Sequence, residues 1–221
     1  VGDFLLSRSI NPLGVPIDGK GPLSKNKNTP LSELEADAPG IEERQFITEQ
    51  FLTGITMIDS IIPLGKGQRE LILGDAHSGK TSLLLDIIIN QKKTGVICIL
   101  ALIGKPSVTI RNLMDILLTN KALDYTTIVA TSSSDIAPLI FLTPKTAFSL
   151  AEYFQKKGKD VLLILDDLGS HAKIYREISL LGGKSPGRES YPGDMFYQHA
   201  HLLERAGKFL PQYGGGSITA L

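Results

Sequence analysis

The stretch from Gly74 to Thr81 constrains the fold of this chain more than any other, because it matches the pattern G-x-x-x-x-G-K-[ST]. This pattern binds phosphate where a β-strand leads into it and an α-helix leaves it. Its glycines let the backbone curl, so that successive N–H groups point at a phosphate at the positive end of the helix. A mostly apolar run, residues 70–73, precedes it, and a helical pattern follows. The sequence therefore predicts a strand, a phosphate-binding loop (P-loop) and a helix, in this order.

The predicted ligand of the P-loop is a nucleotide, ATP or ADP, together with Mg²⁺. Lys80 is expected to reach the β- and γ-phosphates, and the hydroxyl group of Thr81 is expected to bind the metal. The predicted nucleotide-binding residues are Gly74, Asp75, Ala76, His77, Ser78, Gly79, Lys80 and Thr81.

A second part of the site is predicted at Asp166, which ends the apolar run 161–165. An acidic residue in this place holds the Mg²⁺ shell of P-loop proteins. Ligands of open α/β sheets lie beyond the carboxyl ends of the strands, so Asp166 and the P-loop fall on the same edge. A strand that ends in Asp is a weak indication alone, since Asp also begins helices. Together with a P-loop earlier in the chain, it favours Mg²⁺ binding by Thr81 and Asp166.

Apolar runs alternate with segments of helical period, which is the pattern of an α/β protein with a mostly parallel central sheet covered by helices on both faces. The predicted strands are residues 70–73, 96–103, 126–131 and 161–165. The predicted helices are residues 79–91, 108–119, 146–157, 169–181 and 195–209. Residues 1–53 are rich in turn-forming Pro, Gly, Asn and Asp, and they are expected to form an extended lead-in.

Composition narrows the function classes. The 23 basic and 23 acidic residues balance, so no net field favours nucleic acid or anionic lipid. The single cysteine, Cys98, lies in an apolar run and is expected to be buried and unreactive, which suits a reducing compartment. The apolar runs are much shorter than the roughly 20 residues of a membrane span. We expect a soluble chain without a signal peptide, cut from a longer protein.

Several stretches along nearly the whole chain resemble the alpha subunits of rotary ATP synthases, and their order and spacing carry the resemblance. These stretches are residues 11–22 (NPLGVPIDGKGP), 38–41 (APGI), 53–55 (TGI), 58–60 (IDS), 63–75 (PLGKGQRELILGD), 152–154 (EYF), 186–189 (PGRE), 191–194 (YPGD), 202–206 (LLERA) and 216–221 (GSITAL).

The resemblance implies a RecA-like P-loop domain in residues 54–221, preceded in residues 1–53 by the lead-in from an amino-terminal β-barrel. It also implies a ring in which alpha and catalytic beta subunits alternate around a central shaft subunit and couple proton transport to ATP synthesis or hydrolysis. Such a ring would lie at the inner face of an energy-coupling membrane, attached only through the complex. The arginine that reaches into the neighbouring site and most of the adenine pocket are expected after Leu221.

The resemblance also bears on catalysis. Beta subunits of this family carry a glutamate, which activates the attacking water, just after the strand that follows the P-loop helix. The matching residue here is Lys105, whereas typical alpha subunits have Gln. An ammonium group cannot accept a proton at neutral pH unless burial lowers its pKa by several units. No Asp or Glu occurs between Gln91 and Met114, and Asp167 is expected to begin the helix near Gly169. We therefore assign no catalytic residue and predict ATP binding with slow turnover or none.

Other departures from the alpha pattern leave a diverged rotary-type motor open as an alternative. They are Ala76 and His77 in the loop, Gly169, Ser170 and His171 after Asp167, and Gly183 and Lys184 further on. A second alternative is a self-sufficient ring ATPase of the secretion or helicase type, which would need a carboxylate at position 105. A third, a small-molecule kinase or GTPase, lacks support because no guanine-recognition signature (Asn-Lys-x-Asp) is present.

Overall fold

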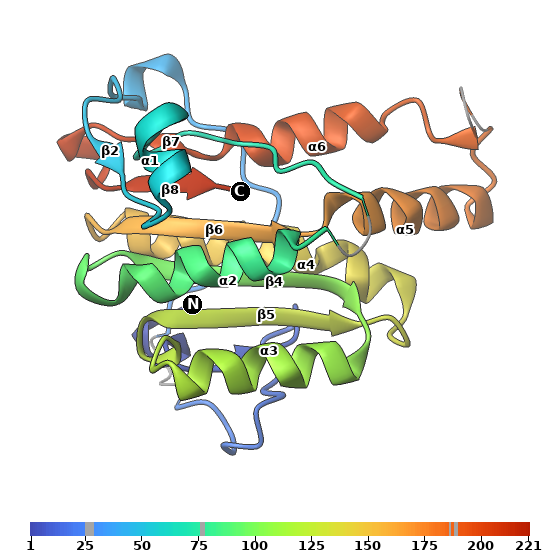
Figure 1. Cartoon of the computed structure of the whole chain (residues 1–221). Helices are drawn as coiled ribbons and strands as arrows, with labels where there is room; N and C mark the ends of the chain where they lie inside the picture. Colours follow the sequence, from blue (N-terminus) through green and yellow to red (C-terminus); the bar gives the residue numbers. More distant parts are fainter. Residues whose placement is uncertain (25–28, 76–77, 186, 188–189) are drawn as a thin grey trace.

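The computed structural model describes residues 1–24, 29–75, 78–185, 187 and 190–221. Within these ranges a six-stranded sheet has the strand order β1-β5-β4-β6-β8-β7, and all neighbours are parallel except β7 and β8 (Figure 1). Its strands are β1 (Ser9–Ile10), β4 (Ile97–Lys105), β5 (Thr126–Ser132), β6 (Asp160–Asp166), β7 (Gly207–Lys208) and β8 (Ser217–Ala220). A separate antiparallel pair consists of β2 (Gln50–Phe51) and β3 (Leu64–Gly65).

Helices cover both faces of the sheet (Figure 1). Helices α2 and α3 pack on one face, and α4 and α6 pack on the other. The helices are α1 (Thr56–Ile61), α2 (Lys80–Asn90), α3 (Ser107–Thr119), α4 (Ala137–Gln155), α5 (Leu168–Leu181) and α6 (Met195–Glu204). Short 3₁₀ turns lie at Asp3–Leu5, Ile41–Glu43, Gln91–Lys93, Leu123–Tyr125 and Pro211–Tyr213. None of the described helices combines the length and the apolar character that a membrane crossing requires.

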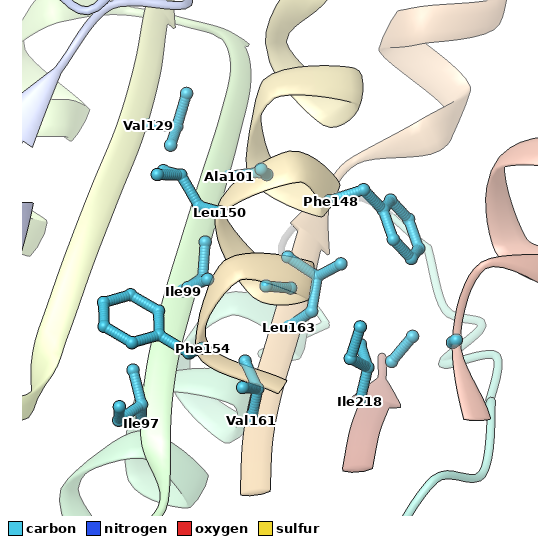
Figure 2. Close-up of a cluster of buried hydrophobic side chains, with 14 of the residues drawn as sticks. Ile97, Ile99, Ala101, Val129, Phe148, Leu150, Phe154, Val161, Leu163 and Ile218 are labelled. Carbon is cyan, nitrogen blue, oxygen red and sulfur yellow. The ribbon is translucent and has the colours of Figure 1, made fainter. Parts of the chain in front are cut away.

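The central strands are apolar on both faces because each face supplies a separate core. Successive side chains of β4 alternate between the two cores, with Ile99 and Ala101 facing α4, and Leu100 and Leu102 facing α2 and α3. Figure 2 shows the first core, where Phe148 and other side chains of α4 lie against the strands. Cys98 is fully buried in the second core, as expected, and burial raises the pKa of its thiol. Strands covered on both sides explain the near-continuous apolar runs in the sequence.

Three of the predicted strands, residues 96–103, 126–131 and 161–165, are confirmed as β4, β5 and β6. The predicted strand at residues 70–73 is wrong. Only Arg69 pairs there, as an isolated parallel bridge to Ala220, and Leu71 and Leu73 are 71% and 81% exposed. A strand needs a neighbouring backbone along its length, and no strand pairs with residues 71–73 among the described residues.

Two predicted helix boundaries are also wrong. The helix predicted at 146–157 starts nine residues earlier, at Ala137, because Pro138 fits the first turn and the added turns are buried against the sheet. The helix predicted at 195–209 ends at Glu204, because Gly207 and Lys208 pair with β8 instead. The helices predicted at 79–91, 108–119 and 169–181 are confirmed as α2, α3 and α5.

The lead-in contributes to the main sheet. Ser9 and Ile10 pair in parallel with Ile128 and Val129, so β1 becomes the edge strand beside β5. No periodic pattern indicates this strand, because two residues are too short to show a period. The division of the chain at residue 53 stays a prediction.

Candidate nucleotide-binding site

The P-loop lies where the sequence predicts it, directly before α2. Gly79 has a φ of 93°, a left-handed conformation that favours glycine, and α2 begins at the next residue, Lys80. The Lys80 ammonium group donates to the carbonyl oxygens of Gly74 and Asp75, at 2.6 Å each. Lys80 therefore folds back over its own loop, and a nucleotide would have to draw it away from these carbonyls. Ala76 and His77 lie outside the described residues.

Thr81 and Asp166 lie next to each other, although 85 positions separate them in the chain. Thr81 is in the first turn of α2 and Asp166 is the last residue of β6. The Thr81 hydroxyl group donates to Oδ2 of Asp166 at 3.0 Å, and Asp166 is only 6% exposed. A hydroxyl and a carboxylate are oxygen ligands of the kind that Mg²⁺ prefers, and the remaining ligands usually come from phosphate and water. These two residues therefore fit a magnesium ion held beside the P-loop.

Lys105 completes this cluster in a way that the sequence did not predict. It ends β4, which lies beside β6, and its ammonium group contacts Oδ1 of Asp166 at 2.8 Å and Oδ2 of Asp167 at 3.0 Å. The sequence contained one indication of this contact, because two apolar runs are followed by residues of opposite charge, Lys105 and Asp166. Only the strand order shows that the ends of these two strands are adjacent.

Electrostatics keep Lys105 charged. Burial opposes its positive charge, but the hydrogen bonds and charges of Asp166 and Asp167 outweigh burial and raise the pKa of Lys105 above its usual value. A raised pKa is the opposite of what a proton acceptor at neutral pH requires. The geometry at position 105 thus favours a fixed cation.

Asp167 begins α5, as the sequence predicts. Its Oδ1 atom accepts a hydrogen bond from the backbone N–H of Ser170 at 2.5 Å, which satisfies one free donor of the first turn. Burial alone would raise the pKa of Asp167, but the bonds from Ser170 and Lys105 lower it. The carboxylate is therefore occupied on both oxygens and is poorly placed to activate a water molecule.

A cavity of about 500 Å³ adjoins the cluster. The charged residues on its lining are Arg69, Glu70, Lys80, Asp166 and Asp167. The apolar side chains on its lining are Leu71, Ile72, Leu73, Leu84, Leu165, Leu168, Leu203 and Leu221. A cavity of this size, lined by both charged and apolar residues, suits a ligand with a phosphate group and an apolar ring.

Comparison with known families agrees with this geometry. A family described as the ATP synthase alpha/beta family, nucleotide-binding domain, matches residues 54–221. The chain belongs to this family.

Two relatives are proteins named ATP synthase subunit alpha, from the Clostridium botulinum strains Langeland (type F) and Hall (type A). This chain is 50% identical to each over all 221 residues, and it spans 43% of the length of each relative. The resemblance to alpha subunits and the predicted α/β nucleotide-binding fold are thereby confirmed.

No group of three or more His, Cys, Asp or Glu side chains in the described part of the chain could hold a metal ion. His171 of α5 and His199 of α6 contact each other. The predicted metal ligands Thr81 and Asp166 would act together with phosphate oxygens, as is usual for Mg²⁺.

Proposed function

We propose that this chain is the nucleotide-binding domain of a non-catalytic, alpha-type subunit in the ring of a rotary ATP synthase or ATPase. It would bind ATP or ADP with Mg²⁺ at residues 74–81 and Asp166. The bound nucleotide would stabilise the contact with catalytic beta subunits around a central shaft subunit. The ring would be attached peripherally, at the inner face of an energy-coupling membrane, and would couple proton transport to ATP synthesis or hydrolysis.

The observation that carries this proposal is the position of Lys105. A water molecule that attacks a phosphate needs a group to orient it and accept its proton. The residue that ends β4 could offer such a group, but here it is an ammonium held by Asp166 and Asp167. Both carboxylates are therefore paired with a cation, and Asp167 also begins α5. Asp166 and Asp167 thus support binding, and neither of these two carboxylates is a free base.

The binding residues have separate tasks. Lys80 would exchange the carbonyl groups of its own loop for phosphate oxygens, and the backbone N–H groups at the start of α2 would point at the same phosphates. Thr81 and Asp166 would hold Mg²⁺, which neutralises phosphate charge when it is bound. The apolar lining beside Leu165 and Leu168 would exclude water from the phosphate end.

The test uses the intact subunit that contains this chain. We expect it to bind ATP, and we expect Lys80→Ala to weaken binding at least about tenfold, because the ammonium contact with phosphate is lost. Lys93→Ala, which removes an exposed lysine in the turn after α2, serves as the matched control and should bind as the wild type does. Titration with a fluorescent ATP analogue gives both affinities.

Measurement of ATP turnover distinguishes a non-catalytic subunit from a self-sufficient ring ATPase. The isolated subunit should show no multiple-turnover hydrolysis, and ATPase activity should appear only with the beta partner, with which it should co-elute on size exclusion. Hydrolysis by the isolated subunit that Lys80→Ala abolishes would instead indicate a self-sufficient ring ATPase.

A further inference from the structure

Lys105 occupies one oxygen of the Asp166 carboxylate, which Mg²⁺ would need as a ligand. Its ammonium group contacts Oδ1 of Asp166, while Oδ2 of the same carboxylate accepts from Thr81. Asp166 is 6% exposed, so little water competes for either oxygen. A magnesium ion arriving at Thr81 would therefore meet a carboxylate whose negative charge is already partly offset.

The charge of Lys105 offsets the negative charge beside it only in part. Lys105 pairs with the carboxylates of Asp166 and Asp167, so these three groups together carry one net negative charge. A neutral side chain at position 105 would leave two net negative charges there. These charges would attract a divalent cation and repel the phosphates of a nucleotide, and both effects are strong where water is scarce.

We propose that Lys105 is a resident cation that substitutes for part of the charge of Mg²⁺, so that this site binds nucleotide with little dependence on the metal. The Lys105 ammonium group and the Thr81 hydroxyl group contact the same carboxylate, that of Asp166. Thr81 lies in the first turn of α2, where the phosphates would bind. The ammonium group offsets the negative charge of Asp166 whether or not the metal is present. This inference rests on the proposed function, because it concerns the same nucleotide site.

The experiment compares the affinity of the intact subunit for a fluorescent ATP analogue in excess Mg²⁺ and in excess EDTA. For the wild type we expect the two dissociation constants to agree within about threefold, since fixed ammonium charge remains when the metal is removed. In Lys105→Gln the ratio should rise to about tenfold or more, because Asp166 and Asp167 then repel phosphate unless Mg²⁺ is bound. Lys105→Arg keeps the charge and should behave as the wild type does.

Lys66→Gln is the matched control. Lys66 also holds two carboxylates, Glu49 at 2.8 Å and Asp160 at 2.9 Å, but Asp160 is at the opposite end of β6 from the P-loop. Its removal should leave the ratio of affinities unchanged. Circular dichroism of each variant shows whether the fold is intact.

The outcomes separate the two proposals. A wild type that binds the analogue in neither condition overturns the proposed function and this inference with it. A wild type that binds only with Mg²⁺ leaves the proposed function standing and overturns the role of Lys105. An equal ratio in the wild type and in a folded Lys105→Gln variant also overturns that role, and neither of these two results requires measurement of ATPase activity.

Discussion

His171 and His199 form a pair between α4, α5 and α6, in which His171 is buried and His199 is half-buried. Nε2 of His171 lies 3.1 Å from the carbonyl oxygen of Phe141, which can only accept, so this nitrogen carries the proton. Nδ1 of His171 then accepts from Nε2 of His199 at 2.9 Å. The His171 ring is 2% exposed and stacks on Phe141. Burial, the neighbouring His199 and the charge of Lys145 lower the pKa of His171 to about 4.

This pair predicts a loss of stability in mild acid. The folded-state pKa of His171 lies below its usual value of 6.5, so protons bind the unfolded chain more tightly. The free energy of unfolding should fall as the pH drops from about 6.5 to about 4, by up to about 1.4 kcal/mol per pH unit from this group. His171→Gln cannot take up the proton and should reduce the slope. Urea denaturation at a series of pH values measures this slope. Parallel plots of the free energy of unfolding against pH for the wild type and the variant would contradict the prediction.

The position of β8 depends on the backbone conformation of the glycines that connect it to the turn at Pro211–Tyr213. Gly216 has a φ of 56°, and a Cβ atom there would lie 2.4 Å from the carbonyl oxygen of Lys159. The next residue, Ser217, donates its N–H to the same oxygen and starts β8 beside β6. The tight approach therefore helps to place β8, whose Ala220 lines the cavity beside the P-loop.

Gly216→Ala is expected to destabilise the protein by at least about 2 kcal/mol, because the left-handed conformation costs 1–2 kcal/mol and the backbone must also move. Gly193→Ala is the control, since a Cβ atom there meets nothing within 4 Å and no left-handed conformation is involved. Its free energy of unfolding should stay within about 1 kcal/mol of the wild type. Denaturant unfolding measures both, and equal effects would refute the steric account.

At the scale of the whole molecule, the lead-in is joined to the sheet and the helices by buried polar contacts. Arg205, at the end of α6, is 1% exposed and donates to Glu152 of α4 at 2.6 Å. The same guanidinium group donates to the carbonyl oxygen of Leu34 at 2.8 Å, and Ser149 donates to that of Glu33 at 2.7 Å. One side chain thus connects α4, α6 and the lead-in.

Arg205→Met should destabilise the protein by about 3–5 kcal/mol, because it leaves the carboxylate of Glu152 buried without its partner. The double variant Arg205→Met with Glu152→Met removes both charges and should recover most of this loss. Denaturant unfolding of the two variants and the wild type completes the comparison. A double variant as unstable as the single one would show that packing around Arg205, and not the unpaired charge, causes the loss.

The sequence by itself determined the features that depend on neighbouring residues and on periodicity. The strands β4, β5 and β6 are apolar on both faces, so their runs were readable, and the pattern from Gly74 to Thr81 located the loop before α2. The end of β6 identified Asp166 as a candidate, and Asp167 was recognisable as a helix start. The binding roles of these residues stay predictions.

The tertiary structure alone decided the features that depend on which strands are neighbours. The contact of Lys105 with Asp166 and Asp167 exists because β4 lies beside β6 in parallel. Residues 70–73 are mostly apolar but form no strand, since the isolated bridge is at Arg69 and the N–H of Glu70 alone among residues 70–73 bonds to Ala220. The single feature that most changes the interpretation of the P-loop, a fixed cation on Asp166, therefore arises from strand order, which no local stretch of sequence encodes.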